Sequence, residues 1–220
     1  MKSTLPLPKR LSTILEVLGP LWPRAVPLLD HRSCFELLCA VVLSAQCTDD
    51  QVNRVTPSLF ATWPDAAAMA GAAPEAVGLV IHSTGFYRTK ALHLVGLSKL
   101  LLEQHGGKVP ESMEELLELP GVGRKTANLV LSSCFGQPGI IVDTHVLRVA
   151  FRLGIENRRD PLLVEKAIAA NLEKASWTAF SHAVNRHGKW VCTARKPGCG
   201  TCPIRELCPR KGMESMPSSH

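Results

Sequence analysis

Signals for the start of helices recur along almost the whole sequence of 220 residues, and they limit the fold more than any other feature. In several places a Ser or Thr is followed three residues later by Glu or Gln, the capping pattern of a helix N-terminus. These pairs are Ser33 with Glu36, Thr48 with Gln51, and Ser112 with Glu115. One short strand-like run, residues 139–142, is too brief to build a sheet. We therefore predict an all-α fold.

Glycine and proline separate the predicted helices from one another. Gly106 and Gly107 end the longest helix, and Pro161 suits the first position of a helix that Asp160 opens. The helices are predicted over residues 33–45, 48–63, 65–71, 74–82, 87–105, 112–119, 124–135, 143–154 and 176–187, with one more starting at residue 160. No helix is predicted before residue 33.

The composition is that of a soluble globular protein, with 45% hydrophobic and 20% charged residues. The net charge of +6 favours a polyanionic partner, either nucleic acid or an anionic membrane surface. The longest apolar run, residues 37–43, is too short to span a membrane, and the N-terminus lacks the apolar stretch of a secretory signal. We expect a cytoplasmic protein, associated with the nucleoid if its source is bacterial.

The most informative stretch is LLELPGVGRKTANLVL, residues 116–131. Two helices joined by Pro-Gly-Val-Gly, residues 120–123, place unpaired backbone N–H groups at the start of the second helix, where glycines allow close approach. Arg124 and Lys125 add positive charge there. The pattern predicts a phosphate-binding helix–hairpin–helix, and a simple turn between two helices is the alternative.

The eight cysteines form two groups. Four are scattered in apolar surroundings, where free cysteine behaves as a small buried hydrophobe. The other four, Cys192, Cys199, Cys202 and Cys208, lie within 17 residues and suggest a metal site in a reducing compartment. Their spacing alone is compatible with a zinc ion or a four-iron cluster. Basic residues in and before this loop can face phosphates or form a solvated surface.

Several of these motifs occur in the order found in one family of DNA repair enzymes. LPGVGRKTAN at 119–128, VDTHVLRV at 142–149 and C-x6-C-x2-C-x5-C at 192–208 resemble endonuclease III, as does FELLCAVVLSAQCTDDQVN at 35–53. The resemblance implies two all-α lobes with DNA in the cleft between them. One is a six-helix lobe, residues 27–137, with the hairpin at 112–135. The other joins residues 1–26 to 138–220 and holds a [4Fe–4S] cluster in the loop 192–208.

The resemblance also implies a bifunctional DNA glycosylase and AP lyase, which excises oxidised pyrimidines and cleaves the strand 3′ to the abasic site. The nucleophile of the family falls on Lys125 and its essential carboxylate on Asp143. An amine can displace a base from C1′ and stay attached as a Schiff base, whose iminium permits β-elimination. Without the resemblance, Lys125 would be assigned to phosphate binding and Asp143 to a helix cap, and Asp143 can serve as cap and catalyst together.

A base inside a duplex must be extruded before its C1′ is attacked, and side chains are expected to fill the gap. Gln46 matches the gap-filling glutamine of the family, and Thr84 and Phe86 lie where the family has its wedge, although Phe86 can equally belong to the core. Both wedge residues, like Cys47, depart from the usual pattern of the family, and these departures bear on the preferred lesion. The other residues expected to contact DNA are Pro120, Gly121, Val122, Gly123, Arg124, His145, Arg186, Lys189, Arg195 and Lys196.

The predicted partner is double-stranded DNA that contains a damaged pyrimidine or an abasic site, bound by a monomer. Two other functions remain open from the sequence. A monofunctional glycosylase of the same superfamily would share the hairpin and the cluster but would lack the lysine. A non-catalytic DNA-binding iron–sulfur protein would bind abasic DNA and form no covalent product.

Overall fold

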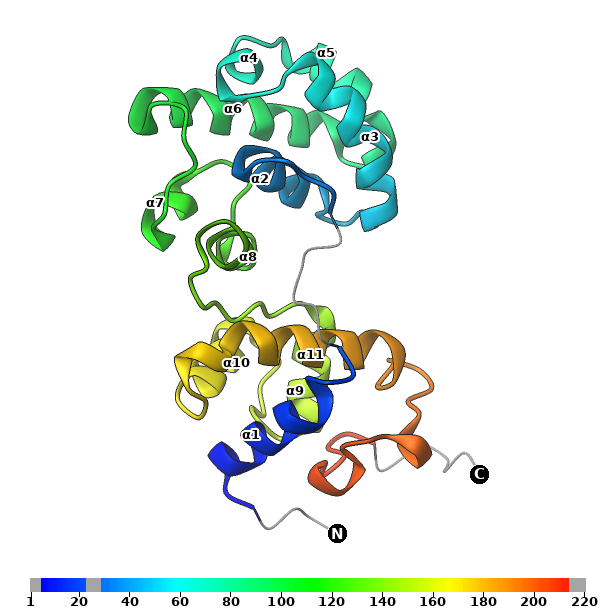
Figure 1. Ribbon diagram of the computed structural model, residues 1–220. Coiled ribbons are helices and arrows are strands. Elements are labelled where there is room, and N and C mark those ends of the chain that lie inside the picture. The colour runs from blue at the N-terminus through cyan, green and yellow to red at the C-terminus, as the bar shows by residue number, and fades with distance from the viewer. Residues whose placement is uncertain (1–4, 23–28, 214–220) are drawn as a thin grey trace. The chain divides into compact units, whose positions relative to one another are not determined.

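The computed structural model describes residues 5–22 and 29–213, and within these ranges all regular secondary structure is helical (Figure 1). The predicted all-α fold is therefore confirmed. Residues 139–142 form no strand, and Ile140 and Val142 are instead buried in a hydrophobic core. The chain divides into two compact units, residues 26–137 and residues 1–25 together with 138–220. None of the helices in the described ranges is long and apolar enough to cross a membrane.

The unit of residues 26–137 has seven α-helices in its described part, where the resemblance implied six. One of the seven, α4, is only five residues long. The helices are α2 (Cys34–Leu43), α3 (Asp49–Thr62), α4 (Ala66–Ala70), α5 (Pro74–Val80), α6 (Tyr87–His105), α7 (Met113–Glu118) and α8 (Arg124–Phe135), with a 3-10 turn η1 (His82–Thr84) before α6.

The predicted helix starts in this unit are confirmed by hydrogen bonds. The hydroxyls of Ser33, Thr48 and Ser112 accept the backbone N–H groups three residues later, at N–O distances of 3.2–3.3 Å. The predicted end of α6 is confirmed as well, because Gly106 follows it in the left-handed conformation at φ 57°. Local capping thus fixes the bounds of these helices.

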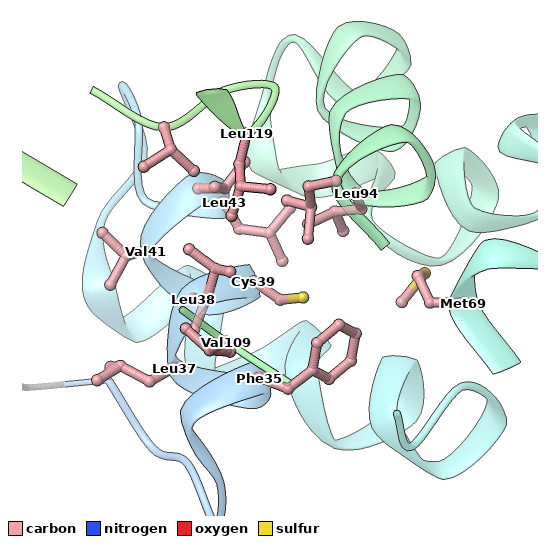
Figure 2. Close-up of a cluster of buried hydrophobic side chains, with 14 of the residues drawn as sticks. Phe35, Leu37, Leu38, Cys39, Val41, Leu43, Met69, Leu94, Val109 and Leu119 are labelled. Atoms are coloured by element: carbon pink, nitrogen blue, oxygen red, sulfur yellow. The ribbon is translucent and has the colours of Figure 1, made fainter. Parts of the chain in front are cut away.

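Helix α2 lies at the centre of this unit. Every residue from Phe35 to Leu43 is buried, and α2 packs against α3, α6 and α8, while α4 and α5 pack on α6 (Figure 1). Figure 2 shows Phe35, Leu38 and Leu43 among the side chains of α4 and α6, including Met69 and Leu94. Burying one such side chain stabilises a fold by about 1.5–3 kcal/mol. The segments that follow α2 and precede α6 are therefore anchored to a rigid core.

The second unit contains α1 (Leu7–Leu18), α9 (Thr144–Arg152), α10 (Pro161–Ala169) and α11 (Trp177–Trp190), with 3-10 turns η2 (Lys174–Ser176), η3 (Cys199–Thr201) and η4 (Arg205–Leu207). Helix α1 was not predicted. It starts after Pro6 without a side-chain cap, so it lacks the capping signal by which α2, α3 and α7 were predicted. Its apolar face is nevertheless fully buried, through Leu11, Ile14 and Leu18, and the helix packs on α11.

Candidate functional site

The hairpin between α7 and α8 is held in one conformation by its glycines. Gly121 has φ 79°, and a Cβ atom built on it would lie 2.7 Å from Nδ1 of His93. The next residue, Val122, is buried and donates its N–H to the carbonyl of Leu119 at 3.1 Å. Pro120 packs close to Gly96 of α6, since a Cβ there would meet the proline ring at 3.4 Å. Only glycine fits position 121, and the turn therefore reaches the start of α8 in a fixed geometry.

Helix α8 begins without a side-chain cap. Its N-cap is Gly123, whose carbonyl accepts the N–H of Ala127 at 2.9 Å. Gly123, Arg124 and Lys125 are exposed, and Lys125 is the second residue of the helix. The N-terminus of a helix carries a partial positive charge and N–H groups that suit an anion. This helix start has the features that the sequence predicts for phosphate binding, and the binding itself stays a prediction.

Helix α9 begins in the opposite way, because Asp143 closes its start. One carboxylate oxygen, Oδ1, accepts the N–H of Val146 at 2.8 Å, so the capping role is confirmed. The other, Oδ2, accepts the side-chain amide of Asn185 at 2.7 Å. Asn185 lies on α11, and no feature of the sequence pointed to it. Its contact with a residue 42 positions away depends on how α11 packs against α9.

The packing of α11 on α9 is close at Gly188. A Cβ atom there would lie 3.0 Å from side-chain atoms of both His145 and Val149. The carbonyl of Gly188 accepts a hydrogen bond from Arg148 at 2.7 Å, and the same guanidinium nitrogen lies 3.2 Å from Nδ1 of His145. His145 is thus half-buried and held from one side by Arg148, and its contact with DNA stays a prediction.

The four clustered cysteines surround one pocket in the second unit. Cys192 follows α11 by two residues, Cys199 begins η3, and Cys202 and Cys208 flank η4. Four cysteine thiols around one space are a ligand set that can hold an iron–sulfur cluster.

Two buried side chains, Arg152 and His187, contact the cysteine loop. Arg152 donates to Sγ of Cys192 at 3.2 Å and to the carbonyls of Thr193 and Ala194 at 2.7 and 3.0 Å. Nε2 of His187 lies 3.7 Å from Sγ of Cys202. Burial raises the pKa of the Cys202 thiol to about 11. A thiolate at this position therefore needs compensating positive charge, which iron supplies when the cluster is bound.

The residues expected to enter the duplex lie in the same unit as Lys125. Gln46 and Phe86 are exposed, Phe86 at 67%, and both adopt left-handed backbone angles, φ 53° and 47°. The exposure of Phe86 excludes the alternative that it belongs to the core. Thr84 does not fit a contact with DNA and corrects the prediction. Its side chain is buried, and its hydroxyl donates to the carbonyl of Ile81 at 2.8 Å.

The predicted basic residues of the second unit lie on α11 and in the cysteine loop. Arg195 and Lys196 are exposed. The cationic groups of Arg186 and Lys189 lie 5.1 and 5.3 Å from the ring centre of Trp190. Trp190 in turn stacks on Trp22 at 5.0 Å, an aromatic pair that sequence analysis did not find. Cation–π contacts of this kind restrict the two basic side chains.

The structure assigns the two predicted catalytic residues to different units. Lys125, the hairpin 120–124, Gln46 and Phe86 belong to residues 26–137. Asp143, His145, the basic residues of α11 and the four cysteines belong to the other unit. Each half is assembled locally, and the pairing of Lys125 with Asp143 stays a prediction.

The helical hairpin of α7 and α8 and the four-cysteine loop lie in two segments whose family matches identify a base-excision DNA glycosylase with an iron–sulfur site. Residues 39–174 match the HhH-GPD superfamily of base excision DNA repair proteins, and residues 192–208 match the iron–sulfur binding domain of endonuclease III. The chain belongs to the endonuclease III family, and the predicted [4Fe–4S] cluster, in place of zinc, is confirmed by this match.

Curated relatives and solved structures agree with this assignment. The chain is 46% identical over 202 residues to endonuclease III of Synechocystis, covering 91% of this chain and 92% of the relative. It is 42% identical over 189 residues to that of Escherichia coli K12, covering 86% and 90%. A structure of a trapped covalent intermediate of endonuclease III with DNA superposes with a TM-score of 0.87 at 41% identity, covering 92% of this chain and 96% of that one.

Proposed function

We propose that this DNA glycosylase is bifunctional, and that Lys125 is the nucleophile of both its reactions. The observation that carries the proposal is an exposed lysine in the first turn of an uncapped helix, within a chain similar over most of its length to an enzyme trapped covalently on DNA. The substrate is double-stranded DNA with an oxidised pyrimidine or an abasic site, bound by a monomer in the cytoplasm, at the nucleoid if the source is bacterial.

The proposed reaction uses Lys125 twice. The neutral amine attacks C1′, the bond from C1′ to the base breaks, and the base leaves with the bonding electrons and takes up a proton. The amine loses a proton as the sugar ring opens, which gives an iminium between Nζ and C1′. This iminium acidifies C2′, so a base removes the C2′ proton and the C3′–O bond breaks. The 3′ phosphate departs, and water then releases the lysine from the cleaved sugar.

Asp143 stabilises positive charge on the sugar as the base departs and accepts protons from the reacting groups. Its carboxylate suits this role because Oδ1 is fixed by the N–H of Val146 and Oδ2 by Asn185. The proposal requires Lys125 of one unit and Asp143 of the other to act on the same nucleotide.

The remaining predicted contacts have two roles, binding of DNA phosphates and stabilisation of the duplex from which a base is extruded. The start of α8 and the basic residues Arg186, Lys189, Arg195 and Lys196 bind phosphates. Gln46 fills the place of the extruded base and Phe86 stacks against its neighbours. The four cysteines would hold the cluster, which would join the chain around Cys192 to that around Cys208 and so restrain Arg195 and Lys196 near the DNA backbone.

Reduction with borohydride tests the nucleophile, because it converts the iminium into a stable amine and traps the protein on DNA. The wild-type protein should form a trapped adduct on an abasic duplex and nick it, and Lys125→Ala should do neither while still binding the duplex. Lys166→Ala, which removes an exposed lysine of α10, should trap as the wild type does.

Two outcomes would overturn this function. Base release without a trapped adduct would indicate a monofunctional glycosylase. Binding of abasic DNA without base release or cleavage would indicate a non-catalytic protein.

A further inference from the structure

Lys90 of α6 is a buried cation that the proposed reaction does not use. The residue is 4% exposed, and its ammonium group donates to the backbone carbonyls of Leu43 and Thr84, each at 2.8 Å. A buried ammonium is costly unless its hydrogen bonds are satisfied, and here the partners that are seen are two neutral carbonyls. Burial accordingly lowers the pKa of Lys90. The ammonium group of Lys90 therefore restrains the chain segments to which the two carbonyls belong.

The two carbonyls belong to residues that lie just before the two segments expected to enter DNA. Leu43 is the last residue of α2, and Gln46 follows it by three positions. Thr84 is the last residue of η1, and Phe86 follows it by two. Lys90 therefore joins two chain segments that are about forty residues apart in sequence, through a single charged group beneath the surface.

Both exposed side chains sit on strained backbone. Gln46 and Phe86 have φ angles of 53° and 47°, a region that residues with a Cβ rarely adopt. Such conformations persist only when the surrounding structure holds them. A second link joins the same two segments, since Nε2 of Gln51 donates to the hydroxyl of Ser83 at 2.7 Å.

We propose that Lys90 is a positioning residue that holds the Gln46 and Phe86 segments at a fixed separation, so that both side chains enter the duplex together when a base is extruded. This inference rests on the proposed function. Lys90 is buried and touches neither DNA nor the reacting atoms. It acts through the carbonyls of Leu43 and Thr84 and contributes to recognition of an extruded nucleotide, with no part in the grip on phosphates.

The variant Lys90→Met tests the inference, because it keeps the length of the side chain and removes its charge and its donors. The matched control is Ser98→Ala on the same helix, which removes a buried hydrogen bond to the carbonyl of Leu94 at 2.7 Å and leaves both segments untouched. Each protein is titrated with a duplex that holds a tetrahydrofuran abasic analogue and with an undamaged duplex. Extrusion is followed by the fluorescence of 2-aminopurine, and thermal unfolding is recorded alongside.

We expect Lys90→Met to lose about tenfold to a hundredfold in preference for the abasic duplex, because small misplacements of positioned groups have effects of this size. Affinity for the undamaged duplex should stay within about twofold, since the residues that grip phosphates are unchanged. Ser98→Ala should lower the unfolding temperature and keep the preference. An unchanged preference in Lys90→Met, or an equal loss in Ser98→Ala, would overturn the inference.

A surface variant covers the case in which Lys90→Met does not fold. Gln51→Ala removes the second link and should lower the preference in the same direction by about threefold to tenfold. No loss in Gln51→Ala would then overturn the inference.

Borohydride trapping of the same proteins separates the two proposals. A wild-type protein that cannot be trapped refutes the proposed function, whereas normal trapping with unchanged preference in the variants refutes only the role of Lys90.

Discussion

The helices α8 and α9 each carry one of the proposed catalytic residues at their N-terminus, and the two ends are built in opposite ways. Helix α8 starts at Gly123 with no side-chain cap and with Arg124 and Lys125 exposed. Helix α9 starts at Asp143, whose carboxylate caps it and is held in turn by Asn185. The same local element thus serves two purposes in one protein.

The difference shows how helix ends divide the tasks of binding and of holding a reactive group. An end left open by glycine presents N–H groups and a partial positive charge to an external anion such as a phosphate. An end closed by a carboxylate has already used that capacity on its own side chain. In return, the carboxylate is fixed in orientation, which suits a group that must face charge developing on a sugar.

The largest expected effect comes from removing the charge of Asp143 while keeping its cap. Asp143→Asn should lower turnover about a thousandfold, the scale of a lost acid–base or electrostatic group. Because Asn caps helices as well as Asp, thermal stability should stay within about 0.5 kcal/mol of the wild type. Single-turnover base excision and thermal unfolding measure the two quantities.

Asp143→Ala provides the control, since it loses the cap as well and should cost about 1 kcal/mol in stability. Wild-type turnover in Asp143→Asn would show that the closed end of α9 is structural only.

Asn185→Ala should lower the rate of base excision by about tenfold to a hundredfold, because a hydrogen bond to a charged group contributes about 1.5–3 kcal/mol. Affinity for an abasic duplex should not change, since Asn185 orients a carboxylate and binds no phosphate in the proposed mechanism. The control is Asn171→Ala, which removes a side-chain bond to the carbonyl of Ala167 on α10 at 2.8 Å. Equal loss of rate in both variants would reduce Asn185 to a contributor to stability.

Substitution of the two glycines that precede α8 tests its open N-terminus. Gly121→Ala should destabilise the protein by about 1–3 kcal/mol, because of its positive φ and the contact with His93, and weaken duplex binding about tenfold. Gly123 has φ −105°, and a Cβ atom added there would have no neighbour within 4 Å. Gly123→Ala should therefore destabilise the protein by less than about 1 kcal/mol. Urea unfolding and fluorescence anisotropy test both. Equal effects of the two substitutions would contradict the role given to the turn.

The smallest effect should separate the phosphate contacts of the two units. Arg124→Gln at the open start of α8 and Arg195→Gln in the cysteine loop should each reduce the slope of log affinity against log salt by about 1. Lys166→Gln, outside both regions, should leave the slope unchanged. A slope that falls in only one of the two variants would identify the unit that binds the backbone.

Much of the fold was predictable from short stretches of sequence. Glycines mark the end of α6 and the start of α8, and the predicted bounds of both helices agree with the structure to the residue. Helix α1 was missed because neither a capping side chain nor a glycine turn precedes its start at Pro6, although its buried face has helical spacing. Thr84 was predicted to contact DNA but is buried, since nothing in its local sequence distinguishes it from exposed Phe86.

The sequence by itself determined the residues that carry local patterns: the lysine that follows a glycine turn, the aspartate that precedes a helix and the four spaced cysteines. These depend on neighbours within a few positions, which the chain fixes before it packs. Only the tertiary structure decided that Asn185 holds Asp143 and that Lys90 joins the roots of two distant segments. Such contacts link residues about forty positions apart, so they follow from how helices pack and from no pattern along the chain.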